Sequence, residues 1–307
     1  MRPRGRVLHA GDTPNMGQTT KIQWCDGTVN PTMGCEGCEL WNRERGIKRC
    51  YAGVLHDRHG GRNPGFAPVF EEVVPFPGRM AEAAKWGDLR GRRRRDKPWL
   101  DGCARLIFVS DMSDALSASV SFEYLETEII DTVTSATGRR HSWLWLTKRL
   151  ARMAKFSAWL ADHGIGWPSN LWVGTSITTG ATTSRVRDLA KVGDKQTTRF
   201  LSVEPQSEDV RLRTQLDKVD WLIQGGESGP QAEPFDLAWA RRLRDDCVDK
   251  GTAYFLKQLG RHPVDDGQPV KLRDGHGGDW DEWSAELRVR ELPAAARGAG
   301  AGSPSRG

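Results

Sequence analysis

The chain has 307 residues and a formal net charge of +5, and 37% of its residues are hydrophobic and 28% are charged. This length allows one large or two ordinary domains, and the composition is typical of a soluble globular protein. No apolar run approaches the ~20 residues that a membrane helix needs, and the N-terminal residues lack a signal-peptide core. We therefore expect a cytoplasmic protein with no membrane partner.

The two ends of the chain differ in composition from the rest. Residues 1–18 are rich in Pro, Gly and Arg without periodicity, so we expect a disordered extension in which Met16 is a candidate for the true start. Residues 294–307 are of low complexity and are expected to form a disordered tail. The folded body then spans residues 19–293, which we interpret as a single domain.

Three of the six cysteines lie close together near the start of this body. Cys35 and Cys38 form a C-x2-C pair, which lets two thiolates converge at a tight turn, and Cys50 follows. Gly34 and Gly37 free the backbone at this turn, so its amides can donate hydrogen bonds to sulfur. Three thiolates can ligate three irons of a cubane cluster and leave the fourth iron open. They can equally form three-quarters of a zinc site.

Other cysteines and two histidines bear on this choice. Cys25 could supply a fourth thiolate, which would favour a closed zinc site. His56 and His59 are near enough in sequence to compete as zinc ligands. Cys103 and Cys247 are expected to be buried thiols. A reducing compartment keeps such thiols available for a metal.

Short apolar runs alternate with amphipathic segments along the body. The candidate strands are Lys21–Cys25, Glu71–Pro75, Arg105–Val109, Ser142–Leu146, Leu171–Gly174, Arg199–Val203, Asp220–Gln224 and Ala253–Leu256. The candidate helices are Arg79–Trp86, Phe122–Ala136, Leu150–Asp162, Thr183–Lys191 and Leu237–Lys250. This alternation predicts an α/β fold with a parallel sheet covered by helices. Eight strands suit a (β/α)8 barrel of the TIM-barrel type, with a six-stranded partial barrel or an open doubly wound sheet as alternatives. Residues 261–292 are expected to be an irregular C-terminal appendage.

Polar residues follow nearly every candidate strand, and in a parallel α/β fold they gather at one edge of the sheet. We therefore expect a shared pocket there, lined by Asp111, Ser113, Asp114, Lys148, Glu204, Gly225, Gly226, Glu227 and Lys257. The glycines would let backbone amides approach a ligand, and Glu227 could accept hydrogen bonds from an ammonium group or a ribose. The two lysines could bind an anionic substrate or pair with the two glutamates. Taken singly, each residue could instead be a helix cap or an exposed charge.

The densest basic run is Arg90–Arg95, which is either a solvated loop or a patch that contacts phosphate. The chain also has thirteen tryptophans, and many of them precede or lie within candidate strands. Core packing is therefore the expected role of the tryptophans rather than stacking on bases.

Many short motifs, in order along the body, resemble those of one protein family. They include Thr20-Lys21-Ile22-Gln23-Trp24, Asn30-Pro31, Gly34-Cys35, Gly37-Cys38, Cys50-Tyr51-Ala52, Ile107–Asp114, Leu146–Arg149, Leu171–Gly174, Phe200–Pro205, Gly225–Gly229, Phe255–Gln258, Gly278-Asp279-Trp280 and Leu287–Glu291. On these motifs the sequence resembles the phage-associated three-cysteine-motif family, a set of phage and prophage proteins of unknown function.

The resemblance implies a cysteine motif and a barrel similar to those of radical S-adenosylmethionine enzymes. Cys35, Cys38 and Cys50 would then ligate a [4Fe–4S] cluster whose open iron binds S-adenosylmethionine. It also implies a three-Cys-motif partner protein.

We therefore expect a phage-type iron–sulfur enzyme with a nucleotide or nucleic acid as the candidate substrate. Cofactor binding is expected at Asp111, Ser113, Asp114, Gly225, Gly226 and Glu227, and catalysis at Lys148, Glu204 and Lys257. One alternative is a zinc-binding accessory protein that binds nucleic acid or a partner without catalysis. Another is a metal-dependent hydrolase that uses Asp111, Glu204 and Glu227.

Overall fold

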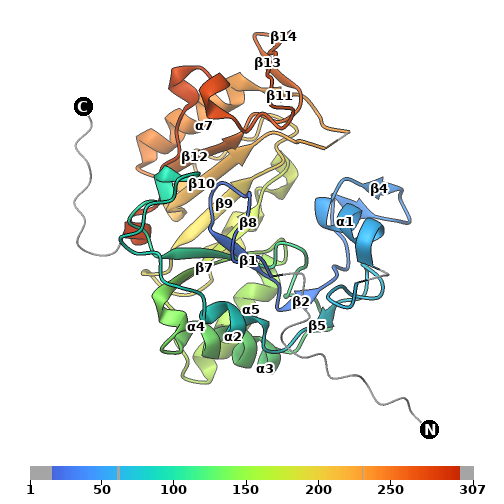
Figure 1. Cartoon of the computed structure of the whole chain (residues 1–307), viewed down its shortest axis with the longest axis vertical. Coiled ribbons are helices and arrows are strands. Elements are labelled where there is room, and N and C mark those ends of the chain that lie inside the picture. The colour runs from blue at the N-terminus through green and yellow to red at the C-terminus, as the bar shows by residue number, and fades with distance from the viewer. Residues whose placement is uncertain (1–15, 61–62, 230, 298–307) are drawn as a thin grey trace.

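The computed structural model describes residues 16–60, 63–229 and 231–297. Its centre is a seven-stranded sheet that curls into a half-barrel (Figure 1). In sheet order the strands are β1 (Gly27–Val29), β6 (Arg105–Val109), β7 (His141–Leu146), β8 (Leu171–Ser176), β9 (Arg199–Val203), β10 (Trp221–Gly225) and β12 (Ala253–Gln258). Every neighbouring pair is parallel. The predicted α/β fold with a parallel sheet is confirmed, and its shape is that of a partial barrel.

Two of the candidate strands are not part of this sheet, so these predictions are wrong. Lys21–Cys25 forms turns, and its carbonyl groups bind a side chain instead of a neighbouring strand. Lys97 Nζ donates to the carbonyl oxygens of Ile22 and Cys25, at 2.7 and 2.5 Å, and to that of Thr20 just before them, at 2.7 Å. Of Glu71–Pro75, only β5 (Val74–Pro75) is extended, and it pairs antiparallel with β2 (Thr32–Met33). The sheet begins instead at β1, which is too short to carry a clear apolar pattern.

Side chains of the central strands alternate between the two faces of the sheet, as the strand period of two requires. In β6, Ile107 and Val109 belong to the core on the outer face, whereas Leu106 and Phe108 belong to the core on the inner face. Both faces are therefore apolar, which explains the near-continuous hydrophobic runs in the sequence. The strand tryptophans are buried in these cores, as predicted: Trp143, Trp145, Trp172 and Trp221.

Helices cover the outer face of the sheet. They are α2 (Arg79–Ala84), α3 (Phe122–Leu125), a π-helical turn (Glu126–Ile130), α4 (Asp131–Thr134), α5 (Leu150–Asp162), α6 (Arg185–Leu189) and α7 (Leu237–Lys250). The π-helical turn carries Glu128, whose carboxylate accepts hydrogen bonds from the backbone N–H groups of Gly78 and Met80 at the start of α2. In the described ranges, no helix has both the length and the apolar character needed to cross a bilayer.

Short segments from the two ends of the body cover the two edges of the sheet. At one edge Gly17 exchanges backbone hydrogen bonds of 3.0 and 2.9 Å with Thr28 of β1. At the other, the Leu256 amide donates to Val289 and the Glu291 amide donates to Tyr254, both at 2.9 Å. Residues 1–15 and 298–307, which include most of the expected disordered ends, lie outside the described residues.

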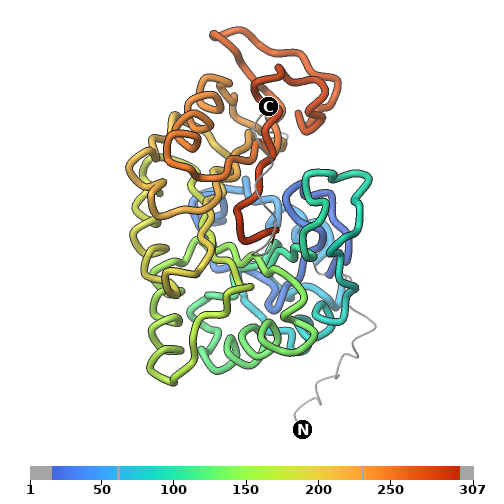
Figure 2. Tube along the Cα trace, turned by 90° about the vertical axis from the view of Figure 1, so that its left-hand side faces the viewer, coloured from blue at the N-terminus to red at the C-terminus, as the bar shows by residue number. Residues whose placement is uncertain are grey.

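The inner face is filled by segments that are not strands. Trp24, Leu100 and Cys103 lie in the inner core, together with Leu292 and Ala296 from the end of the described chain. Figure 2 shows this last segment, in red, passing between the helical layer and the N-terminal segments. The expected C-terminal appendage contains β13 (Pro263–Asp265) and β14 (Gln268–Pro269), which form a small sheet with β11 (Phe235–Asp236).

The basic run Arg90–Arg95 contains one buried arginine. Arg94 binds Asp26 with Nε and Nη2, at 2.8 and 3.2 Å from the two carboxylate oxygens. The two side chains are only 8% and 6% exposed. Arg94 also donates to the backbone carbonyls of Leu100, Cys103 and Ala104. This arginine is therefore part of the fold, whereas Arg92, Arg93 and Arg95 are exposed.

Replacing Arg94 with methionine should lower the free energy of unfolding by about 3–5 kcal/mol, because it leaves the Asp26 carboxylate buried without its partner. Urea denaturation measures this change. The matched control is Arg93→Met, an exposed neighbour, which should change the free energy of unfolding by less than about 0.5 kcal/mol. Equal effects of the two substitutions would contradict the structural role of Arg94.

Candidate metal centre at the mouth of the half-barrel

The three cysteines lie in a segment that follows β1, residues 30–76, which we call the cysteine lobe. It projects beside the sheet (Figure 1) and contains β2, β5, α1 (Tyr51–His59) and a hairpin of β3 (Trp41–Asn42) and β4 (Ile47–Lys48). Cys35 and Cys50 both pack against the small core of this lobe, which is formed by Met33, Trp41, Ala52, Ala67, Phe70 and Met112. The lobe faces the carboxyl ends of the strands, which we call the mouth of the half-barrel.

The turns around Cys35 and Cys38 depend on two glycines, as predicted. Gly34 and Gly37 have φ angles of 92° and 95°, which are left-handed conformations that favour glycine. A Cβ atom at Gly37 would lie 2.7 Å from the carbonyl oxygen of Trp41, so no larger residue fits. Cys38 and Trp41 exchange two backbone hydrogen bonds of 3.0 Å, which closes the turn.

The Leu40 amide donates a 3.4 Å hydrogen bond to Cys38 Sγ. The backbone N–H of Gly37 lowers the pKa of Cys35, and the backbone N–H groups of Ala52 and Gly53 lower the pKa of Cys50, in both cases against burial. Cys50 is also the N-cap residue of α1, so its side chain lies at the positive end of a helix. Backbone amides around sulfur stabilise negative charge there, and in iron–sulfur proteins they also set the reduction potential.

The thiols influence one another electrostatically. The pKa of Cys35 is raised to about 12, first by burial and then by Asp114, Cys38 and Cys50, although the Gly37 amide lowers it. Burial likewise raises the pKa of Cys50. These two groups are therefore neutral thiols at neutral pH in the protein alone. A bound metal would have to displace their protons, and metal binding should therefore weaken as the pH falls.

A lone metal ion and a cluster require different arrangements of the cysteine sulfurs. A lone Zn²⁺ binds sulfur at about 2.3 Å, so its thiolates must meet at one point. In a cubane cluster each thiolate binds a different iron, and the sulfurs surround the cluster instead. Among residues 16–60, 63–229 and 231–297, no three Cys, His, Asp or Glu side chains form a group that could hold a metal ion.

The candidates for a fourth ligand lie elsewhere. Cys25 is fully buried in the inner core of the half-barrel, not in the core of the cysteine lobe. His56 is buried, and its Nε2 lies 2.8 Å from the carbonyl oxygen of Ala67. His59 is exposed on α1. In the described part of the chain, Cys25, His56 and His59 do not form a metal-binding group with Cys35, Cys38 and Cys50.

Lys148 connects the fourth candidate strand, now β7, to the cysteines. Its Nζ donates to Cys38 Sγ at 3.3 Å and lies 3.7 Å from Glu39 Oε1. Burial opposes a charged lysine here, but Cys38, Glu39 and Cys50 raise the pKa of Lys148 above its usual value. Glu39 also accepts two hydrogen bonds from Arg185, of 3.0 and 2.9 Å. These partners outweigh burial and lower the pKa of Glu39 to about 2.

Asp111 lies at the mouth, after β6. Its Oδ1 accepts a 2.6 Å hydrogen bond from Asn30, the residue after β1, and its backbone carbonyl accepts one from the Tyr51 hydroxyl. Burial raises the pKa of Asp111 to about 6, although Asn30 and Thr28 donate hydrogen bonds that lower it. The Asp111 carboxyl group is therefore mostly ionised at neutral pH. Its residue contacts Tyr51, which follows Cys50 in the chain.

Ser113 and Asp114 hold loops together. The Ser113 hydroxyl accepts a 3.1 Å hydrogen bond from Thr32 in the cysteine lobe. Both oxygens of Asp114 accept hydrogen bonds from the Thr147 hydroxyl at 2.9 Å, and one also accepts from the Leu116 amide at 3.1 Å. These contacts join the loop after β6 to the cysteine lobe and to the loop after β7. Asp114 also lies 3.8 Å from Arg149, whereas Asp111 has no ion pair among the described residues.

Glu227, after β10, forms an ion pair that sequence reasoning did not identify. Arg49 binds it with two nitrogens, at 2.5 and 3.3 Å, and Glu233 lies 3.5 Å from the same guanidinium. Arg49 precedes Cys50, so this pair ties the cysteine lobe to the far side of the sheet. Glu227 was expected to bind an ammonium group or a ribose of a ligand, but its carboxylate binds Arg49 instead.

Glu204 and Lys257 pair with each other across the inner face of the mouth. Gly225 lies beside them, since a Cβ atom there would be 3.6 Å from Glu204 Cδ. At Gly226 a Cβ atom would lie 2.5 Å from the carbonyl oxygen of Leu259, so this glycine allows close packing rather than ligand approach. Ser110, at the end of β6, has a φ of 70° and a buried hydroxyl with no hydrogen-bond partner among the described residues. An unpaired buried hydroxyl and a strained backbone are features of ligand sites.

The structure thus brings the predicted residues to one edge of the sheet, but in distinct roles. The residues that sequence reasoning missed are Asn30, Glu36, Glu39, Arg49, Tyr51 and Arg185. A signal for several of them was present, because the cysteine segment carries charges opposite to those that follow β7 and β10. Complementary charge across two segments is a cue for contact between them.

The raised pKa of Asp111 predicts a pH dependence of stability. The folded protein releases this proton near pH 6 and the unfolded chain near pH 4, so the folded state binds the extra proton between these values. Unfolding free energy should therefore fall as pH rises from about 4 to 6, by about 3 kcal/mol relative to Asp111→Asn, which cannot titrate. Denaturation of both proteins at a series of pH values measures the difference. The exposed Asp96→Asn variant is the control, and if it reproduced the Asp111→Asn profile the assignment would fail.

Comparison with known proteins adds a family but no activity. A model of the family described as "Protein of unknown function (DUF5131)" matches residues 19–291. Neither the curated proteins nor the solved structures gave a match. The matched residues include β1, the cysteine lobe and all the strands of the half-barrel. The chain therefore belongs to the DUF5131 family of proteins of unknown function.

Proposed function

We propose that this protein is an iron–sulfur enzyme of the radical S-adenosylmethionine type, with a [4Fe–4S] cluster ligated by Cys35, Cys38 and Cys50. The observation that supports the proposal is the group of three neighbouring thiols, with backbone amides close to each of them, beside the mouth of a parallel half-barrel. Three thiolates leave one iron of such a cluster free for a small molecule, whereas a closed zinc site needs a fourth ligand.

When bound, the cluster would supply the electron that cleaves S-adenosylmethionine. The protein's own part is to hold the cofactor and keep water away. Asp111 is the best group for the cofactor's ammonium, because its carboxylate lies at the mouth next to β1 and is not in an ion pair in the described structure. Glu227 is less suited, since it already binds Arg49. Ser113 and Asp114 would support this site through the loops they join.

The substrate would lie toward Glu204 and Lys257, across the inner face from the cysteines. Gly225 lies next to this pair, which can exchange protons or hydrogen bonds with a polar substrate. Below it the inner face is apolar and aromatic, with Phe108, Trp172, Phe200 and Phe255 in its core. An apolar floor excludes water, which protects a reactive intermediate.

Three further parts of the proposal come from the resemblance and from cysteine chemistry. The phage association suggests a nucleotide or nucleic-acid substrate, and the family implies a three-Cys-motif partner protein. The cytoplasm is the proposed location, because a reducing compartment preserves thiols and a cluster.

The proposal predicts that the protein, purified without oxygen, contains about four irons and four sulfides per chain and little zinc. With S-adenosylmethionine and a low-potential reductant it should release 5′-deoxyadenosine, measured by chromatography. Serine at Cys35, Cys38 or Cys50 should each abolish both signals, because each removes one cluster ligand.

The matched control is Cys25→Ser, which changes a buried thiol outside the cysteine lobe and should leave iron content per folded chain unchanged. Stoichiometric zinc without iron would instead support the alternative of a zinc-binding accessory protein. A fully loaded and reduced cluster that releases no 5′-deoxyadenosine would refute the radical reaction.

A further inference from the structure

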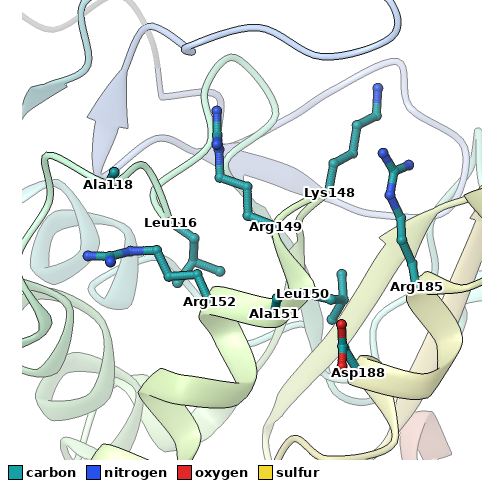
Figure 3. Close-up of a pocket in the computed structure, with 9 residues that line it drawn as sticks. All are labelled: Leu116, Ala118, Lys148, Arg149, Leu150, Ala151, Arg152, Arg185 and Asp188. Atoms are coloured by element: carbon teal, nitrogen blue, oxygen red, sulfur yellow. The ribbon is translucent and has the colours of Figure 1, made fainter.

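A pocket of about 330 Å³ lies where α5 begins, next to the cysteine lobe. Figure 3 shows the residues that line it: Leu116, Ala118, Lys148, Arg149, Leu150, Ala151, Arg152, Arg185 and Asp188. Four of them are basic and one is acidic. In Figure 3 the long side chains of Lys148, Arg149 and Arg185 extend toward the top of the view, whereas that of Arg152 extends to the left. The expected catalytic residue Lys148 is therefore also part of a cationic pocket.

The positive charge of this pocket is only partly neutralised by the protein. Lys148 and Arg185 share the carboxylate of Glu39. Arg149 lies 3.1 Å from Glu36 and 3.8 Å from Asp114. The one acidic residue of the lining, Asp188, pairs with Lys191 outside the lining. Positive charges that line one pocket repel one another, so an anion bound between them would be stabilised.

Arg152 is the cation least satisfied by the protein. Its Nη2 donates to the carbonyl oxygen of Val120 at 2.6 Å, and its guanidinium lies over the ring of Phe122, 4.7 Å from the centroid. Its Nε is buried and has no hydrogen-bond partner among the described residues. No carboxylate of the described ranges pairs with it. A guanidinium held by a carbonyl and a ring is fixed in place while it keeps its full charge.

The backbone adds to the same field. The 13-residue helix α5 begins at Leu150, and its N-cap Arg149 makes no side-chain capping hydrogen bond. No acidic residue lies in its first turn. The first amides of a helix have no partner within the helix, and here Leu150 and Ala151 of the first turn line the pocket, whereas the Arg152 amide donates to the carbonyl oxygen of Arg149 at 3.0 Å. A helix start with basic side chains and no cap is suited to an anion with several acceptor oxygens.

We propose that this pocket binds a phosphoryl group of the substrate. Tetrahedral phosphate oxygens can accept hydrogen bonds from guanidinium, ammonium and amide groups together, which matches the donors that line the pocket. Lys148 both lines the pocket and donates to Cys38 Sγ, so a phosphate bound here places the rest of the substrate beside the cysteines. The assignment to the substrate rests on the proposed function, whereas phosphate binding itself does not.

Isothermal titration of the full-length protein with inorganic phosphate at low salt tests the pocket. Arg152→Gln should weaken binding about tenfold or more, because it removes a charge-assisted contact. The matched control is Arg187→Gln, an exposed arginine on α6 outside the lining, which should stay within about twofold of the parent protein. Binding should also weaken with added salt.

A second variant tests the pocket independently, in case Arg152→Gln does not fold. Ala151→Glu adds an acidic residue to the first turn of α5, which stabilises a helix, yet it places a negative charge in the pocket. We expect a folded protein that has lost phosphate binding. Phosphate affinity unchanged in Ala151→Glu, or weakened as much by Arg187→Gln as by Arg152→Gln, would overturn the inference.

Titration with a nucleoside 5′-monophosphate and with an oligonucleotide that lacks terminal phosphates then separates the two sources of the phosphoryl group. Preference for the first indicates a free nucleotide, and preference for the second indicates a nucleic-acid backbone. Iron content and 5′-deoxyadenosine release are measured separately on the same preparations. Phosphate binding without a cluster would refute the proposed function and leave the pocket standing, and a loaded cluster without phosphate binding would do the reverse.

Discussion

Opposite charges hold the cysteine lobe against the mouth of the half-barrel. The lobe contributes Glu36, Glu39 and Arg49, and the segments that follow β7, β8 and β10 contribute Arg149, Arg185 and Glu227. Partly buried pairs of this kind add little net stability, because both partners lose water, but a wrong pairing leaves charges unmatched. We interpret the pairs as the feature that fixes the position of the lobe. The sulfurs, the cationic pocket and the inner face can face one another only if this position is kept.

This constraint explains why residues that look alike in the sequence have different roles. Asp111, Asp114 and Glu227 are all acidic residues just beyond strands, and each was expected to bind a cofactor. Asp114 is held by a hydroxyl and amides and lies 3.8 Å from Arg149, and Glu227 is held by an arginine of the lobe. Only Asp111 combines a raised pKa with a carboxylate that no described cation neutralises. The chemistry of the mouth therefore depends on which acids the lobe leaves unpaired.

The sequence predicted the strands with long buried runs, because both faces of the sheet demand apolar residues. It also predicted the turns that Gly34 and Gly37 form around Cys35 and Cys38, since these depend only on local geometry. It did not reveal β1, which is three residues long. Nor did it show that Lys97 would hold the backbone of Lys21–Cys25, or that Arg94 would enter the core. These depend on contacts between residues about 70 positions apart. Local pattern contains no information about such contacts.

The sequence also left the roles of the strand-end residues open. A lysine after a strand can bind substrate, pair with an acid or touch a sulfur, and spacing does not distinguish these outcomes. Lys148 and Lys257 illustrate the point, because one contacts Cys38 and the other Glu204. The difference follows from the curvature of the sheet and the path of the lobe over it, which only the folded chain defines.

The backbone hydrogen bonds of Gly17 with β1, and of Val289 and Glu291 with β12, cover the two edges of the sheet. An exposed strand edge invites pairing with other chains, and a closed barrel avoids this by joining its first and last strands. Here segments at the two ends of the described chain protect the edges without closure. The half-barrel can therefore stay open and still resist edge-to-edge association with a second molecule.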